Sequence, residues 1–264
     1  MPSTDFRFTL LGARLRVASL RRSQGFYAGV LGLHVEPGKS GTLALRAAAN
    51  GPGLLTLVES PGVPAAPEDA AGLFHLALLV PDRRSLALIL RRLAETGWPI
   101  EGLSDHGVSE AIYLSDPDGN GLEIYADWPR VQWPQQDGKL AMFTRHLDVD
   151  RLLAEAPGKT SAGLPPGTRL GHVHLRVTNL AEAERFYAGE LGLDVTVREY
   201  PGALFFAADG YHHHIGANTW HVRAGRPSTP HAGLIAVQAL VPGLAAPRTA
   251  SDPDGNTFEL RNQL

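Results

Sequence analysis

Apolar residues recur along this chain at two spacings, one typical of strands and one typical of helices. Residues 11–17 alternate, and residues 72–80 form a short apolar run, so both segments predict strands. Residues 19–31 and 83–96 carry apolar side chains at helical spacing, and a glycine follows each of them. Further strands are expected at 42–47, 53–58, 111–114 and 121–126. The first half of the chain therefore predicts the order βαβββ twice.

The second half repeats the first. LRV, FYAG and LGL occur within residues 13–33 and again, in the same order, within residues 173–193. The turn sequence DPDGN occurs at 116–120 and again at 252–256, and Glu123 and Glu259 follow at equal distances. Matches of this length predict an internal duplication. The repeat adds strands at 172–178, 203–207, 212–219 and 234–241 and a helix at 180–191, and it ends in a shortened fourth unit with only 243–248 between strand and turn.

These patterns predict an α+β fold of four βαβββ modules. We expect a first half at residues 1–128, which contains modules one and two. A linker at residues 129–168, rich in proline and glycine and with a short helix at 149–156, separates it from a second half at 169–264.

Composition narrows the chemistry. The chain is 44% hydrophobic and 19% charged with a formal net charge of −3, and it has no basic stripe that would favour nucleic acid. No apolar run approaches the length of a membrane span, and early charged residues argue against a signal peptide, so a cytoplasmic location is expected. The chain has eleven histidines and no cysteine. Any metal must therefore be held by histidine, aspartate or glutamate.

Five segments together carry a family resemblance: FYAGVLGL, GLFHLALLVP, DHGVSEAIYLSDPDGNGLEIYADWP, LGHVHLRV and YHHHIGANTW. They resemble the vicinal oxygen chelate superfamily, which includes glyoxalases, bleomycin resistance proteins and extradiol dioxygenases, and in particular the two-domain catechol-2,3-dioxygenase-like proteins. The resemblance implies paired modules whose sheets curl into two cups, one of them around a divalent metal. Two imidazoles and one carboxylate suit Fe(II), and Mn(II) accepts the same ligands.

The resemblance also implies where the ligands stand, because the family draws them from the first and last strands of a module. Module two offers His75 and Glu123, and module three offers His172. The matching first-strand positions of modules one and four hold Gly12 and Ala236. The expected metal ligands are therefore His75, His172 and Glu123.

This ligand set requires an unusual pairing, in which module two joins module three across the linker and module one joins module four. The linker is long enough to permit it. The alternative is that module three pairs with module four, which would give a metal site of His172, His214 and Glu259. The sequence favours the first arrangement but leaves both open.

Other positions match catalytic residues of the family. His214 matches the acid–base histidine, with His213 beside it, while Tyr113 and His106 match residues near the substrate. His174 faces the same side of its strand as His172, and we expect it to be a packed polar residue.

The resemblance implies an Fe(II)-dependent extradiol dioxygenase that cleaves catechol or a substituted catechol with O₂. One alternative is a metal-dependent, glyoxalase-like isomerase or lyase, but histidines stand on the last strand of module three, where that class has a further carboxylate. Another is a non-catalytic protein of the resistance type that binds small aromatic compounds, against which the full ligand set argues. The expected partners are a small aromatic diol, O₂ and a second copy of the chain in a homodimer, with neither nucleic acid nor membrane.

Overall fold

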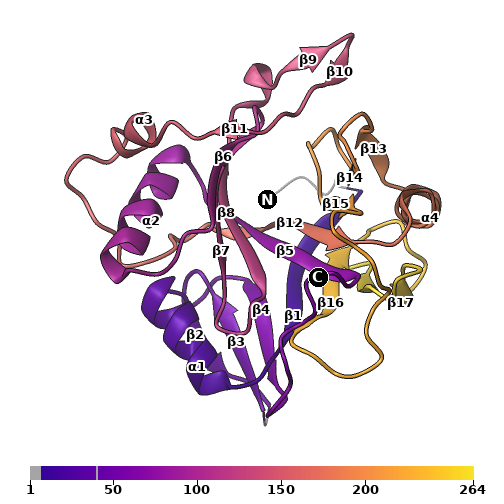
Figure 1. Cartoon of the computed structure of the whole chain (residues 1–264), viewed down its shortest axis with the longest axis horizontal. Coiled ribbons are helices and arrows are strands. Elements are labelled where there is room, and N and C mark those ends of the chain that lie inside the picture. Colours follow the sequence, from indigo (N-terminus) through magenta and orange to yellow (C-terminus); the bar gives the residue numbers. More distant parts are fainter. Residues whose placement is uncertain (1–6, 40) are drawn as a thin grey trace.

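The computed structural model describes residues 7–39 and 41–264, and four modules supply its sheets (Figure 1). Module one comprises β1 (Thr9–Val17), α1 (Leu20–Gln24), the π-helical turn η1 (Gly25–Val30), β2 (His34–Pro37), β3 (Thr42–Arg46) and β4 (Gly53–Glu59). Module two comprises β5 (Gly72–Leu79), α2 (Arg83–Thr96), β6 (Gly102–Asp105), β7 (Ser109–Ser115) and β8 (Gly121–Asp127).

The second half repeats this order after the linker. The linker contains the 3₁₀ turn η2 (Arg130–Gln132), β9 (Gln135–Gln136), β10 (Lys139–Leu140), β11 (Arg145–His146) and α3 (Val149–Leu153). Module three comprises β12 (Arg169–Arg176), α4 (Leu180–Glu184), the π-helical turn η3 (Arg185–Glu190), β13 (Asp194–Val197), β14 (Ala203–Ala207) and β15 (Ile215–Asn218). Module four keeps three strands and no helix: β16 (Gly233–Leu240), β17 (Arg248–Ser251) and β18 (Thr257–Arg261).

Strand pairing joins modules across the linker. One sheet has seven strands in the order β17-β18-β16-β1-β4-β3-β2, and it combines modules one and four. The other has nine strands in the order β11-β6-β7-β8-β5-β12-β15-β14-β13, and it combines modules two and three. Each sheet is joined at its centre by two antiparallel first strands, β1 with β16 and β5 with β12. The structure thus has the cross-linker arrangement that the sequence favoured.

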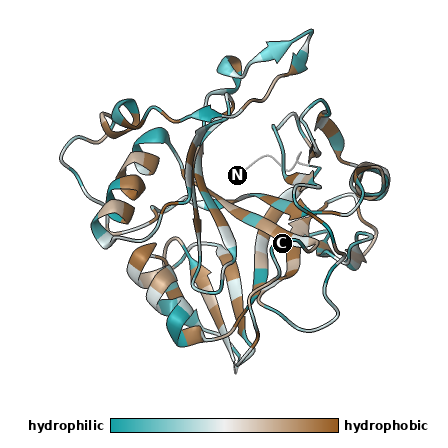
Figure 2. Ribbon diagram, viewed as in Figure 1, coloured by the Kyte–Doolittle hydropathy of each residue, from teal (hydrophilic) through white to brown (hydrophobic). Residues whose placement is uncertain are grey.

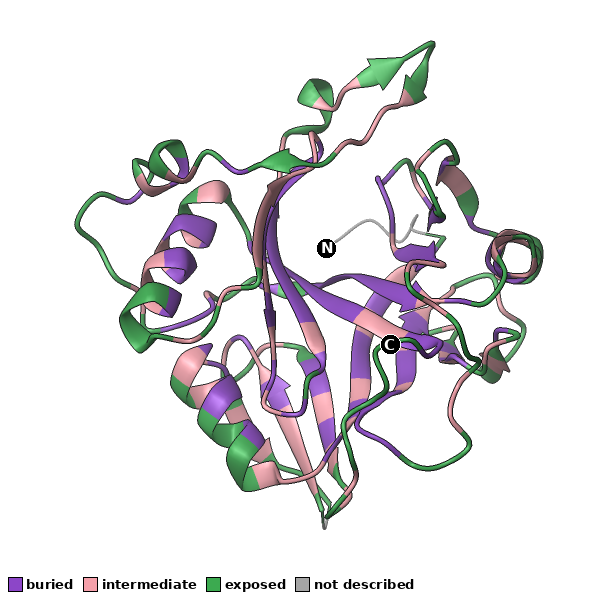
Figure 3. Cartoon of the chain, in the orientation of Figure 1, coloured by how far each residue is buried: buried purple, intermediate pink, exposed green. Residues whose placement is uncertain are grey.

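The nine-stranded sheet forms a cup. In Figure 1, the paired strands β5 and β12 lie at its base, while β6–β8 are on one side and β13–β15 on the other. The hairpin of β9 and β10 projects beyond the rim, and the helices lie on the outside of the molecule. The base is the most deeply buried part, whereas the hairpin and the outer helix faces are exposed (Figure 3).

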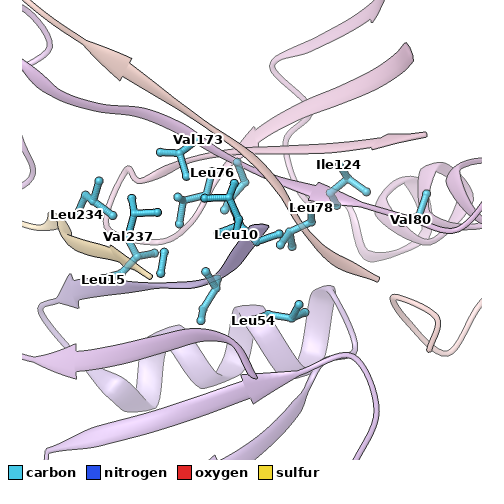
Figure 4. Packing of buried hydrophobic residues seen from close by; sticks show 14 of the residues in the cluster. Leu10, Leu15, Leu54, Leu76, Leu78, Val80, Ile124, Val173, Leu234 and Val237 are labelled. Carbon is cyan, nitrogen blue, oxygen red and sulfur yellow. The ribbon is translucent and has the colours of Figure 1, made fainter. Parts of the chain in front are cut away.

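The two sheets share one apolar core. Leu76, Leu78 and Val173 from the nine-stranded sheet face Leu15 and Val237 from the seven-stranded sheet (Figure 4). Burial of each such side chain contributes roughly 1.5–3 kcal/mol relative to its exposed state. Helices show an apolar face toward the sheets and a polar face outward, as Figure 2 shows for α2. This common core fixes the base on which the functional side chains stand.

The two repeated motifs bind to each other. The hydroxyl of Tyr27 donates to Asp116 over 3.0 Å, and that of Tyr187 donates to Asp252 over 2.7 Å. Each tyrosine comes from an FYAG segment and each aspartate begins a DPDGN turn. Consecutive modules, which belong to different sheets, are therefore tied by a buried hydrogen bond in each half of the chain.

Several local expectations are corrected. The helices expected at 19–31 and 180–191 each change to a π-helical turn at FYAG, where Leu31 N–H bonds Phe26 O and Leu191 N–H bonds Phe186 O, both over 3.0 Å. This wider turn buries both aromatic rings of the motif. The strand expected at 212–219 covers only β15, so the three histidines precede it. The sequence did not locate β2, β6 and β13, which complete the βαβββ order of modules one to three, nor β17 and the short linker strands β9–β11. No helix in the described ranges is long and apolar enough to cross a membrane.

Candidate metal centre

Three ligand-type side chains meet at the base of the cup. Glu123 Oε2 lies 2.9 Å from His75 Nε2 and 3.0 Å from His172 Nε2, and the two nitrogens are 3.3 Å apart. Their side chains come from β8, β5 and β12, and all three residues are buried. The structure therefore brings together the three residues that the family resemblance implied as ligands.

Strand register produces this convergence. Glu123 pairs with Ala77 in the parallel ladder of β8 and β5, and His172 pairs with the same Ala77 in the antiparallel ladder of β12 and β5. A shift in register between Leu170 and His172 turns the side chain of His172 toward the inside of the cup. Gly171 occupies this shift because a Cβ there would collide with the hydroxyl of Tyr125.

The protonation states suit a cation. Burial acts to raise the pKa of Glu123, but the imidazoles of His172 and His75 lower it and prevail, so that pKa lies well below its usual value. Burial lowers the pKa of His172 to about 4, against the opposing effect of Glu123. A carboxylate and neutral imidazoles are the forms that bind a metal.

The spacing also suits a cation. Ligand atoms about 2.1 Å from a metal and at right angles to one another stand about 3.0 Å apart. The three observed separations span 2.9 to 3.3 Å. His75, Glu123 and His172 thus fit one face of an octahedral site. Among the described residues, no fourth histidine, aspartate or glutamate belongs to this group.

A chain of hydrogen bonds stands beside the three ligands. The ring of His213 lies against that of His172, tilted by 46° with 4.1 Å between centroids. His213 Nδ1 lies 2.7 Å from His212 Nδ1, and His212 Nε2 lies 2.9 Å from Asp127 Oδ1. Burial lowers the pKa of His213 well below its usual value, and the neighbouring imidazoles add to this effect. His213 is therefore a neutral imidazole next to the ligands.

A second hydrogen-bonded group joins His106 and Tyr113 of module two to residues of the linker. His106 Nε2 lies 2.7 Å from the hydroxyl of Tyr113, and its Nδ1 lies 3.1 Å from the carbonyl oxygen of Phe143. Thr144 Oγ1 lies 3.1 Å from the same Nδ1 and 2.6 Å from the hydroxyl of Tyr200. A carbonyl can only accept, so a neutral His106 has its proton on Nδ1, and Tyr113 then donates to Nε2. Gly107 allows this approach, since a Cβ there would press on the ring of Phe143.

A cavity of about 400 Å³ opens over the three ligands. Its polar wall includes the ligands, His106, Tyr113 and His213, and its apolar wall is formed by Phe74, Met142, Tyr200, Phe205 and Trp220. No lysine or arginine is among the described residues that line it. The cavity has room for a small aromatic molecule.

Sequence comparisons agree with this geometry. The sequence profile of the Glyoxalase/Bleomycin resistance protein/Dioxygenase superfamily matches residues 9–124 and 169–239. The chain belongs to this superfamily. It is 46% identical over 222 residues to a catechol-2,3-dioxygenase of Bacillus subtilis (strain 168), an alignment that covers 83% of this chain and 76% of the relative.

Solved structures of the superfamily's fold align along nearly the whole chain. Glyoxalase I of Zea mays superposes with a TM-score of 0.54 at 16% identity, covering 97% of this chain and 92% of the maize protein. The cppA protein of Streptococcus pneumoniae TIGR4 superposes with a TM-score of 0.59 at 12% identity, covering 97% of this chain and 100% of that protein. At such identities these likenesses concern the fold alone.

Two sequence candidates lie outside the site. His214, which the resemblance matched to an acid–base residue, lines a different cavity of about 150 Å³ with Phe8 and Tyr211. Glu259 lies in the seven-stranded sheet, where Arg14 Nη1 donates to it over 2.8 Å. The alternative ligand set of His172, His214 and Glu259 is therefore not brought together. The short, bent segment before β15 turns His213, and not His214, toward the ligands.

Some site residues were not identified from the sequence. Asp127 stands four residues after Glu123 on β8, so strand alternation alone would have placed both on one face. Thr144 and Tyr200 gave no such signal, because they come from the linker and from a loop. His174, which we expected to be a packed polar residue, is buried, and it lines the cavity.

Proposed function

We propose that this chain is an Fe(II)-dependent extradiol dioxygenase that opens the ring of catechol, or of a catechol with an uncharged substituent, with O₂. The observation that carries the proposal is the convergence of His75, His172 and Glu123 beneath a cavity that also contains His213 and Tyr113. The identity to a protein named catechol-2,3-dioxygenase supports the same reaction.

The three ligands leave the cavity side of the site to the substrates. An iron held there would bind both catechol oxygens and dioxygen and would carry electrons between them. Glu123 contributes the negative charge, and the imidazoles of His75 and His172 complete a ligand set that also accepts manganese. All three side chains are buried at the base of the cavity.

His213 is the proposed acid–base group. It is neutral, lines the cavity and lies against the ring of His172, so it can accept a hydroxyl proton from the entering catechol. The same nitrogen can return that proton when the oxygen–oxygen bond breaks. Such proton transfers typically accelerate a reaction by roughly 10²- to 10⁴-fold.

Tyr113 and His106 are proposed to position the substrate. Burial raises the pKa of Tyr113 well above its usual value, and the nearby charge of Glu123 adds to this effect, so the phenol remains protonated. Its proton is directed to His106, which leaves the phenol oxygen free to accept from a catechol hydroxyl.

The cavity wall favours uncharged substrates. Phe74, Phe205 and Trp220 offer aromatic surface, and no lysine or arginine among the described lining residues could pair with a carboxylate. A carboxylated catechol would also lie near the charges of Glu123 and Glu101. We therefore expect catechol and methylcatechols to be better substrates than dihydroxybenzoates.

Oxygen uptake by protein loaded anaerobically with Fe(II) tests the proposal. With catechol we expect uptake of one O₂ per catechol, a yellow ring-opened semialdehyde, and loss of both in His75→Ala. A parallel preparation loaded with Mn(II) decides between the two metals. Isomerisation of a hemithioacetal without O₂ uptake would support the glyoxalase-like alternative. Catechol binding without metal or turnover would support a binding protein.

A further inference from the structure

A row of hydrogen bonds runs from a partly exposed carboxylate at the end of β8 to the buried candidate acid–base residue. It contains Asp127, His212 and His213, and it crosses from module two to module three. His212 has no exposed surface and His213 is 5% exposed. The row ends in the cavity, because His213 lines it.

The direction of each hydrogen bond follows from the carboxylate. The oxygens of Asp127 accept one hydrogen bond from His212 Nε2 over 2.9 Å and another from the hydroxyl of Tyr211 over 3.0 Å. With its one N–H on Nε2, a neutral His212 ring has an acceptor at Nδ1. His213 Nδ1, at 2.7 Å, then donates to it. By the same rule His213 Nε2 carries a lone pair and no proton.

We propose that Asp127 and His212 are positioning residues that fix His213 in the tautomer whose Nε2 can accept a proton from the substrate. The inference rests on the proposed function of His213. A carboxylate that orients an imidazole is a general device of acid–base catalysis, and here the partly exposed Asp127 acts on His213 through a second imidazole, that of His212. Without the carboxylate of Asp127, the proton of a neutral His212 could be on either ring nitrogen. His212 Nδ1 would then no longer be fixed as the acceptor for His213.

Asp127→Asn tests the kinetic consequence, because an amide of the same shape can donate to His212 and reverse both tautomers. We expect kcat with catechol to fall about 10²-fold or more, while KM and iron content change less than threefold. Asp209→Asn makes the same change at a carboxylate that pairs with Arg7, and its kcat should stay within twofold of wild type. His212→Phe should reproduce the loss of Asp127→Asn.

Nitrogen-15 NMR of the histidine rings tests the structural claim without substrate or turnover. In the wild type we expect a proton on Nε2 of His212 and on Nδ1 of His213. The opposite pair of tautomers, or full kcat in Asp127→Asn, would overturn the inference even if the protein cleaves catechol. If the wild type does not cleave catechol, the proposed function fails, and the ring tautomers still decide whether Asp127 orients His213.

Discussion

The two cups share a scaffold and differ in the side chains at equivalent places. In the seven-stranded sheet Gly12 pairs with Gln238 as His172 pairs with Ala77, and the same two register shifts flank each pairing. Gln238 pairs in turn with Glu259, as Ala77 pairs with Glu123. One cup therefore repeats the backbone of the other.

Only one candidate ligand persists in the second cup. Glu259 stands at the place of Glu123, but Gly12 and Ala236 replace the two histidines. Arg14, which occupies the place of His174, reaches Glu259 and neutralises it, and Gln238 donates to the other oxygen over 2.9 Å. The comparison teaches that the fold supplies positions for a metal, whereas a few side chains decide whether a metal or a guanidinium balances the carboxylate.

The largest expected difference concerns the two glutamates. Glu123→Gln should lose at least 10-fold in iron content and more than about 10³-fold in turnover, because it removes the negative ligand. Glu259→Gln should keep both within twofold, since Arg14 and Gln238 already occupy that carboxylate. Metal analysis and oxygen uptake on both variants make the comparison. Equal losses in the two variants would mean that the second cup also holds metal.

A second pair of variants compares neighbouring histidines. His213→Ala should retain iron but lose about 10²- to 10⁴-fold in kcat, because it removes the proposed acid–base group. His214→Ala should lose less than threefold, since its side chain lies in another cavity. Steady-state kinetics with catechol decide between them. A larger loss in His214→Ala would return the acid–base role to the residue that the sequence favoured.

His214 is also expected to make the stability of the fold depend on pH. Burial, with His212, lowers the pKa of His214 to about 4, against about 6.5 in an unfolded chain. Between these values the unfolded chain binds a proton that the folded chain does not, so stability falls as the pH drops from 6.5 to 4. His214→Phe should reduce this fall by on the order of 1 kcal/mol in urea titrations at pH 7 and pH 4.5. An equal fall in unfolding free energy in the wild type and in His214→Phe would contradict the lowered pKa of His214.

The smallest effect is expected in the second cup. Arg14→Ala breaks a partly exposed ion pair and leaves Gln238 bound to Glu259, so stability should fall by about 0.2–1 kcal/mol. Iron content and kcat should not change. Chemical denaturation measures the first quantity, and oxygen uptake measures the second. A loss of iron in this variant would show that the two cups are coupled.

Repeats and hydrophobic spacing predicted the modules and the α2 helix, because both depend on local pattern or on an internal match such as FYAG. The candidate ligands came from the family resemblance, which assigns a role to the first and last strands of a module. The choice between His213 and His214 depends instead on how the chain bends before β15, where tertiary contacts outweigh alternation. Thr144 lines the cavity because of the course of the linker, and Tyr200 because of the loop between β13 and β14. Hydrophobic periodicity does not predict the course of either segment.

Anomalous diffraction at the iron edge, on crystals of the iron-loaded protein, tests the central claim most directly. One peak is expected, enclosed by His75, His172 and Glu123, with no second peak beside Glu259. A peak beside Glu259, or none in crystals of protein that cleaves catechol, would contradict the assignment of the metal to the cup of modules two and three.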